Sequence, residues 1–228
     1  GDHRDLHSFP TRRSSDLQAS AIGHGFSATD SYFACNSQAE HGESCAILAG
    51  PYTVTHHKST LLIGGMFSFM NAGSGTNQSN HAYKLGPRHH GVLERGCKTV
   101  SGCHISWPAH IGAFSLVMGH CPPGTDSHEW PFSYLVEQGN AYYVLPGITL
   151  RGVGTLRDIG KWPARDRRSP RVPQTDTVSF DAFSPYTMER VWQAIHTLEG
   201  LNGRFGEDAK EITWNGLRLK EKSVKQGI

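Results

Sequence analysis

Apolar or small residues recur at every sixth position along the centre of the chain. Leu93, Thr99, Ile105, Ile111 and Val117 lie six residues apart, and mostly polar residues and glycines stand between them. A parallel β-helix with triangular coils explains this period, because each coil has three short strands and one residue in six points into the narrow interior. Successive coils stack at about 4.8 Å and share backbone hydrogen bonds. The period therefore predicts a left-handed parallel β-helix built from hexapeptide repeats.

The same spacing recurs on both sides of this stretch, with an interruption at Pro51 and His57. Its further members are Phe33, Ala39, Cys45, Ile63, Phe69, Val144, Leu150 and Leu156. An antiparallel β-sandwich is the alternative fold, because its strands give similar spacings by chance. The three consecutive intact repeats from Thr99 to Val117 favour the β-helix, and we predict an all-β domain of this kind over residues 18–158.

The pattern changes in residues 159–228. Lys161–Asp176 holds three prolines and several basic residues, which predicts an extended linker on the surface. A helix is expected next, with Ser184 as its cap, Pro185 in its first turn and Gly200 at its end. The residues predicted to form its buried stripe are Met188, Val191, Trp192, Ile195 and Leu198. We expect this helix to dock on the β-helix.

The two ends of the chain differ from the rest. Residues 1–17 have no hydrophobic periodicity and resemble a translated sequencing adapter, so they are left out of the fold prediction. A basic arm containing Arg12 and Arg13 is the alternative. Because no helix-ending signal precedes Ile228, we expect a fragment of a longer protein.

Composition excludes several classes of partner. A formal net charge of +2 gives no reason to expect nucleic acid or an anionic membrane as a partner. No stretch reaches the ~20 apolar residues that a membrane span needs. The five cysteines leave one unpaired in any disulfide scheme, and none are spaced CxxC. We therefore expect a cytoplasmic protein with reduced, mostly buried thiols.

The stretch Thr53–Arg95 concentrates the candidate chemistry. It contains five histidines and three asparagines, groups that both donate and accept hydrogen bonds and suit polar ligands and proton transfer. The candidate catalytic bases are His57, His81 and His56. A stack of histidines hydrogen-bonded between coils is the alternative. His81 with His89 and His90 also offers three imidazoles for a zinc site, although no HxH or HxxxH pair occurs here.

Polar residues around these histidines are the candidate substrate-binding groups. Asn77, Ser79 and Asn80 offer amides and hydroxyls to a sugar-like ligand, or alternatively form corner turns. Lys84 and Arg95 are candidates to hold phosphate, unless Glu94 pairs with one of them. The complete candidate set is Asn71, Asn77, Ser79, Asn80, Lys84, His89, Glu94 and Arg95.

Several long strings resemble an uncharacterised bacterial family of hexapeptide-repeat proteins, a domain of unknown function within the trimeric acyltransferase-like left-handed β-helix superfamily. The strings are Gly50–Leu62, Met66–Pro87, Gly112–Gly119, Pro131–Leu135 and Lys161–Arg168. The resemblance extends from about Ser31 to the C-terminus. It implies the β-helix fold, a homotrimer, and missing coils before residue 18.

For function, the resemblance implies transferase-like chemistry: acyl transfer from an acyl-CoA-like donor to a sugar or sugar-nucleotide, with a histidine as general base. A zinc-dependent hydratase or hydrolase of the carbonic-anhydrase type is the alternative, and the spacing of His81, His104 and His110 only partly matches that type. A ligand-binding scaffold without catalysis is the third hypothesis, because fold alone does not fix function.

Overall fold

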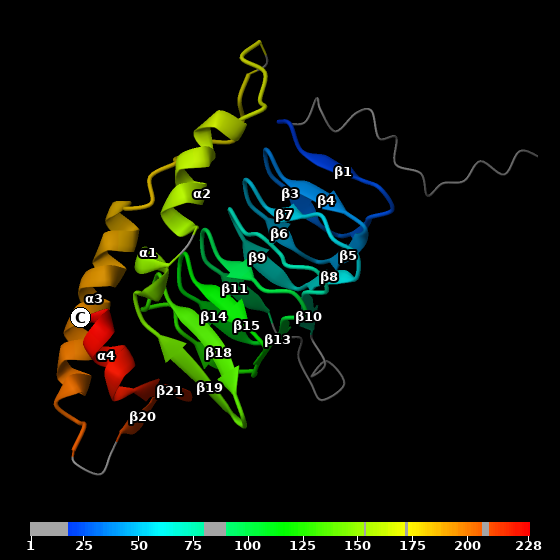
Figure 1. Ribbon diagram of the computed structural model, residues 1–228. Helices are drawn as coiled ribbons and strands as arrows, with labels where there is room; N and C mark the ends of the chain where they lie inside the picture. Colours follow the sequence, from blue (N-terminus) through cyan, green and yellow to red (C-terminus); the bar gives the residue numbers. More distant parts are fainter. Residues whose placement is uncertain (1–17, 80–89, 153, 172, 207–209) are drawn as a thin grey trace, which may run out of the picture.

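Parallel strands stack coil upon coil in the computed structural model, which describes residues 18–79, 90–152, 154–171, 173–206 and 210–228. The coils form a β-solenoid with three faces, and α2 and α3 run along one corner of it (Figure 1). Among the described residues, two of the faces are six-stranded parallel sheets. The predicted all-β parallel β-helix is therefore confirmed.

The three faces are called A, B and C. Face A starts with β1 (Ala21–Gly23), β4 (Gln38–Glu40) and β7 (Val54–Thr55). Parallel bridges through Asn71 join β7 to β12 (Lys98–Thr99). The face then continues with β15 (Leu116–Met118) and β18 (Tyr134–Gln138). Face B consists of β2 (Ser27–Thr29), β5 (Gly42–Cys45), β8 (Thr60–Ile63), β10 (Asn77–Ser79), β13 (His104–Ser106) and β16 (His120–Cys121). Face C consists of β3 (Tyr32–Phe33), β6 (Leu48–Ala49), β9 (Gly65–Phe67), β11 (Gly91–Leu93), β14 (Ala109–Ile111) and β17 (Thr125–Asp126).

The six-residue period marks the interior of the solenoid, as predicted. Leu93, Ile105, Ile111 and Val117 are fully buried, and Thr99 is 5% exposed. Leu93 pairs with Ile111 in register, so three hexads complete one coil. Because side chains alternate along each strand, the residues beside these positions face outward and can form binding sites on the surface.

The spacing at Val144, Leu150 and Leu156 is not a continuation of the coils, so this part of the prediction is wrong. Val144 lies on β19 (Ala141–Leu145), which runs antiparallel to β18. Leu150 and Leu156 lie on the short helices α1 (Ile148–Arg151) and α2 (Thr155–Lys161). The stacking of parallel coils ends where the chain turns back after β18 and forms an antiparallel hairpin with β19. The spacing of six beyond this point is a coincidence.

The C-terminal part begins with the 3-10 helix η3 (Pro163–Arg165) and the helix α3 (Pro185–Asn202). Ser184 caps α3 as predicted, accepting a hydrogen bond from the Thr187 N–H, but the helix continues past Gly200. Beyond it, β20 (Glu211–Trp214) and β21 (Leu217–Lys220) pair with each other, β21 joins β19, and α4 (Glu221–Gly227) follows.

The predicted buried stripe of α3 is only partly right. The buried residues are Thr187, Ala194, Leu198 and Leu201, whereas Trp192 is 70% exposed. Helical spacing fits two neighbouring stripes in this segment, and the one that contains Ala194, Leu198 and Leu201 is buried.

Aromatic residues stack along the corner of the solenoid that α2 covers. Tyr52, Phe69, Phe114 and Phe132 each have positive φ, as residues at sharp coil corners do. Tyr52 stacks on Phe69 with ring centroids 5.0 Å apart, and Phe114 stacks on Phe132 at 4.9 Å. Trp162, which follows α2, packs against this corner at 4.3 Å from Phe69. The corner therefore anchors the helical segment of residues 155–168.

All five cysteines are free, and four of them are buried, in agreement with the prediction of mostly buried thiols. Burial raises the pKa of the Cys35 thiol to about 12, despite the opposing charge of Arg168. None of the helices that the structure describes has the length and apolar character that crossing a membrane requires.

Candidate functional site

A cavity of about 510 Å³ lies between face A and segment 155–168. Its floor comes from outward-facing residues of successive coils, Gln38, Val54, Asn71 and Lys98, which are in parallel register. Its opposite wall comes from α2, Trp162 and η3. We call this space the cationic cleft, and its lining residues are Asn36, Gln38, Tyr52, Val54, His56, Phe69, Met70, Asn71, Lys98, Arg157, Asp158, Lys161, Trp162, Arg165 and Arg167.

The wall of the cleft is held by a polar contact as well as by Trp162. The Asn36 side chain donates to Asp166 Oδ1 at 2.9 Å and accepts from the Arg167 N–H at 2.9 Å. Arg168 binds both carboxylate oxygens of Asp166, with its Nη2 2.6 Å from Oδ2. The Arg168 hydrogen bonds, followed by that of Asn36, hold the pKa of Asp166 well below its usual range. These contacts fix residues 166–168 against a corner of the solenoid.

Positive charge dominates the lining. It includes five lysine or arginine side chains and one carboxylate, that of Asp158. Asp158 forms ion pairs with Lys98 and, at 3.2 Å, with Arg157. Although partial burial raises the pKa of Asp158, its hydrogen bond to Lys98 and the nearby positive charges lower it overall, so the carboxylate is ionised.

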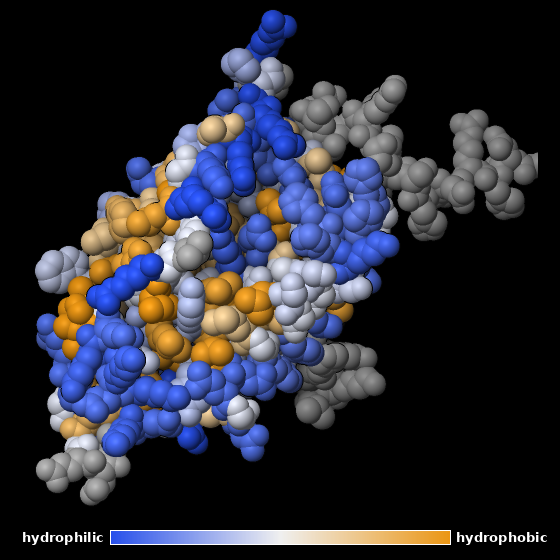
Figure 2. Space-filling model, viewed as in Figure 1, coloured by the Kyte–Doolittle hydropathy of each residue, from blue (hydrophilic) through white to orange (hydrophobic). Residues whose placement is uncertain are grey.

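The remaining three cations, Lys161, Arg165 and Arg167, are exposed, and the part of the chain that the structure describes offers their side chains no acidic partner. Figure 2 shows hydrophilic side chains gathered over α2 and the neighbouring coils. One carboxylate cannot balance five cations, so the cleft attracts anions.

Tyr52 adds a buried hydrogen-bond donor to the cleft. Its side chain is 6% exposed, and among the described residues its hydroxyl has no hydrogen-bond partner. Burial, followed by the charge of Asp166, raises the pKa of Tyr52 to about 12, so the hydroxyl keeps its proton at neutral pH. An unpaired buried hydroxyl costs stability, and a ligand in the cleft would remove that cost.

Two of the predicted site residues, His56 and Asn71, line the cleft. His56 follows β7 and is exposed, and its ring lies edge-on to that of His57 at 6.4 Å. Asn71 bridges β7 and β12 in the middle of the floor. An imidazole and a carboxamide thus share the cleft with the cations.

The other predicted site residues lie elsewhere. His57 is exposed and is not part of the lining, and Asn77 and Ser79 lie on β10 of face B. Arg95 places its guanidinium over the Phe69 ring at 4.5 Å, in the aromatic corner. Glu94 accepts hydrogen bonds from His110 and Tyr186 beside face C. The remaining candidates, Asn80, His81, Lys84 and His89, lie outside the described residues.

The wall of the cleft was not predicted as a site. The sequence predicts a linker for Lys161, Arg165 and Arg167, although the string KWPARDRR (Lys161–Arg168) combines four arginine or lysine residues with a tryptophan. A basic cluster next to a tryptophan, in a stretch that has to cross the surface, is the signal in the sequence that points to this wall.

Comparison with protein families gives one match. The model of a family described as "Domain of unknown function (DUF4954)" matches residues 16–202. The chain belongs to this family. No curated protein matches the chain. The matched region contains the whole lining of the cationic cleft, from Asn36 to Arg167, and α3, but not β20, β21 or α4.

Membership in this family agrees with the predicted resemblance to a domain of unknown function. The family description assigns no activity or ligand.

Proposed function

We propose that the cationic cleft binds a small molecule carrying phosphate or pyrophosphate, and that the protein transfers an acyl group to a sugar or sugar-nucleotide held there. One observation carries the proposal: the cavity is lined by five cations, one carboxylate and the Tyr52 hydroxyl, which has no hydrogen-bond partner in the described part of the chain. Its size falls within the ~300–1,000 Å³ of ordinary small-molecule sites.

The cations of the cleft suit the oxygens of a phosphate group. Arginine presents a planar fork of donors that matches two phosphate oxygens, and lysine adds a compact charge. Arg165 and Lys161 belong to the wall of the cleft and Lys98 to its floor, so a pyrophosphate between them is bound from two sides. The Tyr52 hydroxyl supplies a further donor from the buried end.

His56 is the proposed general base. Imidazole accepts a proton readily near neutral pH, and an exposed ring at the mouth of the cleft can reach a hydroxyl or amine of the acceptor. It would take the proton from this group as the group attacks the thioester carbonyl of the donor. The new C–O or C–N bond forms, the C–S bond breaks, and the thiolate leaves with a proton returned from His56. Asn71 would orient the acceptor.

The donor in this proposal is an acyl-CoA-like thioester. We extend the proposal to a homotrimer with the cleft near a subunit boundary, by analogy with the trimeric β-helix transferases that the sequence resembles. Five free thiols suit a reducing compartment, so the proposed location is the cytoplasm.

An acyl-transfer assay tests the proposal. Purified protein is incubated with acetyl-CoA and a panel of uridine diphosphate sugars and sugar phosphates, and release of free CoA is measured. His56→Gln is expected to lower kcat by about 10²–10⁴, the usual contribution of a general base. His57→Gln, one residue away and outside the lining, is the matched control and is expected to keep wild-type turnover. Equal turnover in wild type and His56→Gln would contradict the role of His56.

The same assay separates the alternatives. A ligand-binding scaffold predicts binding of sugar nucleotides without turnover for any donor and acceptor pair. A metal-dependent hydratase or hydrolase predicts activity that needs no acyl donor and disappears after treatment with a chelator.

A further inference from the structure

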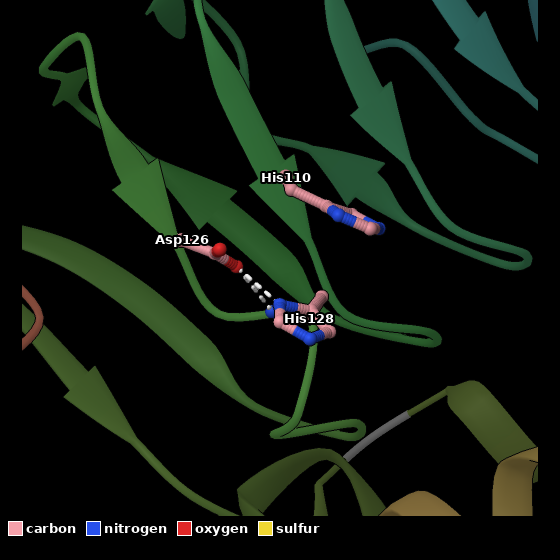
Figure 3. A group of neighbouring side chains, drawn as sticks. All are labelled: His110, Asp126 and His128. Carbon is pink, nitrogen blue, oxygen red and sulfur yellow. Dashed lines mark hydrogen bonds and ion pairs between the residues drawn. The ribbon is translucent and has the colours of Figure 1, made fainter.

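Three potential metal ligands meet on face C, away from the cationic cleft. His110 lies on β14, Asp126 lies beside it on β17 in parallel register, and His128 follows two residues later. One nitrogen or carboxylate oxygen from each of the three lies within 4.8 Å of the others. Figure 3 shows the Asp126 carboxylate against His128 and the His110 ring above them.

The surroundings keep the three side chains together. Asp126 Oδ1 lies 2.5 Å from Nδ1 of His128 and also accepts the His128 N–H at 3.1 Å. The His110 and His128 rings stack with centroids 4.8 Å apart. Two imidazoles and one carboxylate form a ligand set that suits zinc and related first-row divalent cations.

Glu94 determines which nitrogen of His110 is available. Its Oε1 lies 3.0 Å from Nε2 of His110 and accepts a second hydrogen bond, at 2.8 Å, from the Tyr186 hydroxyl of α3. The Glu94 side chain is only 10% exposed, so water competes little with His110 for this carboxylate. With the proton on Nε2, the lone pair of His110 is on Nδ1. Carboxylates hold metal-binding histidines in this way and raise their basicity.

We infer that His110, Asp126 and His128 bind one divalent cation of the zinc class, and that Glu94 is a positioning residue for His110. Donors bound tetrahedrally to Zn²⁺ at about 2.0–2.1 Å stand roughly 3.4 Å apart, so the two rings turn out of their stack and close on the ion. The three side chains are 27–45% exposed, which leaves a fourth position open to water. The site shares no residue with the cationic cleft, so its failure and that of the proposed function are independent.

Cobalt titration tests the inference. Protein dialysed against EDTA and then freed of the chelator is titrated with Co²⁺, followed by visible absorption. We expect d–d bands of a four- or five-coordinate ion that saturate at one equivalent, disappear when Zn²⁺ is added and persist in excess Mg²⁺. No band at one equivalent, or displacement by Mg²⁺, would overturn the site.

Variants identify the ligands. His110→Ala and His128→Ala are expected to lower Co²⁺ affinity by at least 100-fold, and Asp126→Asn by at least tenfold. The matched control is His120→Ala, because the His120 ring lies tilted against that of His104, with centroids 4.5 Å apart on face B, and does not belong to the cluster. It is expected to bind Co²⁺ like the wild type. Wild-type affinity in His110→Ala and His128→Ala, or loss of the band in His120→Ala, contradicts the assignment. Circular dichroism in EDTA shows that each variant is folded.

Glu94 has a distinct test. Glu94→Ala is expected to lower Co²⁺ affinity by ten- to 100-fold while the bands keep their positions, because the three ligands are unchanged. Glu94→Gln keeps an oxygen acceptor for Nε2 and is expected to restore most of the affinity. If Glu94→Ala binds like the wild type, or if Glu94→Gln restores nothing, the positioning role is wrong.

Discussion

Trp162 lies against Phe69 with their ring centroids 4.3 Å apart, and this contact attaches the basic segment to the β-helix. Phe69 belongs to a coil corner and Trp162 to the connection between α2 and η3. The two residues are 93 positions apart in the sequence, and both line the cationic cleft. The width of the cleft therefore depends on the packing of two aromatic rings.

Removing this contact should loosen the wall. Trp162→Ala is expected to destabilise the protein by about 3 kcal/mol, at the low end for a large buried aromatic residue, because Trp162 keeps 8% exposure. It should also weaken pyrophosphate binding. Chemical unfolding and calorimetric titration measure the two effects. The matched control is Trp192→Ala, 70% exposed on α3, which should change stability by less than about 0.5 kcal/mol. Equal effects of the two variants would refute the anchoring role.

The Tyr52 hydroxyl should contribute to binding and not to folding. Tyr52→Phe removes a buried hydroxyl without a partner among the described residues, so stability should stay equal or rise slightly. Pyrophosphate affinity should fall by about three- to tenfold, the loss of one hydrogen bond. Tyr142→Phe is the control, because the Tyr142 hydroxyl donates to the Met118 carbonyl at 3.3 Å. This variant should lose about 1 kcal/mol of stability and bind pyrophosphate like the wild type. The opposite pattern, with Tyr52→Phe destabilising and binding normally, would show that Tyr52 is structural.

The lowered pKa of Asp166 predicts that the protein loses free energy of unfolding in acid. Because Arg168 and Asn36 lower its pKa in the folded protein, the stabilisation is fully present above the unfolded pKa of about 3.9 and is lost as the pH falls below it. The difference in unfolding free energy between wild type and Asp166→Asn should therefore stay constant from pH 5 to pH 8 and shrink below pH 4. Urea unfolding at a series of pH values measures it. A difference that does not vary between pH 5 and pH 3 would mean that the carboxylate charge is not what Arg168 and Asn36 stabilise.

Gly91 should tolerate no side chain. A Cβ at this position would lie 1.9 Å from the Trp107 ring, which is 1% exposed. Gly91→Ala is expected to cost about 2 kcal/mol or more, because the ring and the backbone have to move. Gly200→Ala, in α3 with open space around it, should instead stabilise by about 0.5 kcal/mol through helix propensity. Thermal unfolding compares both with the wild type, and a neutral Gly91→Ala would mean that Trp107 packs elsewhere.

The coils could be predicted from the sequence because their period is local. Ile105 and Ile111 face the interior because each occupies the inward position of a hexapeptide repeat. Each repeat is only six residues long, so the pattern can be read from neighbouring residues. The prediction failed at Leu150 and Leu156, where the period is the same but β19 has already turned back on β18. The six-residue period alone does not determine whether the next strand runs parallel or antiparallel.

The site could be predicted only in part. The residue types of His56 and Asn71 point to a site, but four of the five cations that accompany them come from a segment about 100 residues further along the chain. Asn36 and Asp166 meet through the fold, and no spacing in the sequence links them. His110 and Asp126 are neighbours because one coil of the β-helix separates them, but their spacing of 16 residues differs from the 18 residues of three hexads, so the period does not predict this pair.

Calorimetric titration with inorganic pyrophosphate tests the central claim, that the cleft binds phosphate, most directly. The wild type should bind with an affinity that falls as salt concentration rises, because the charges are partly exposed. The double variant Lys161→Ala/Arg165→Ala should bind at least tenfold more weakly, whereas Arg204→Ala/Lys222→Ala, which removes two exposed cations outside the lining, should bind like the wild type. Absence of binding to the wild type, or equal affinity in all three proteins, would contradict the claim.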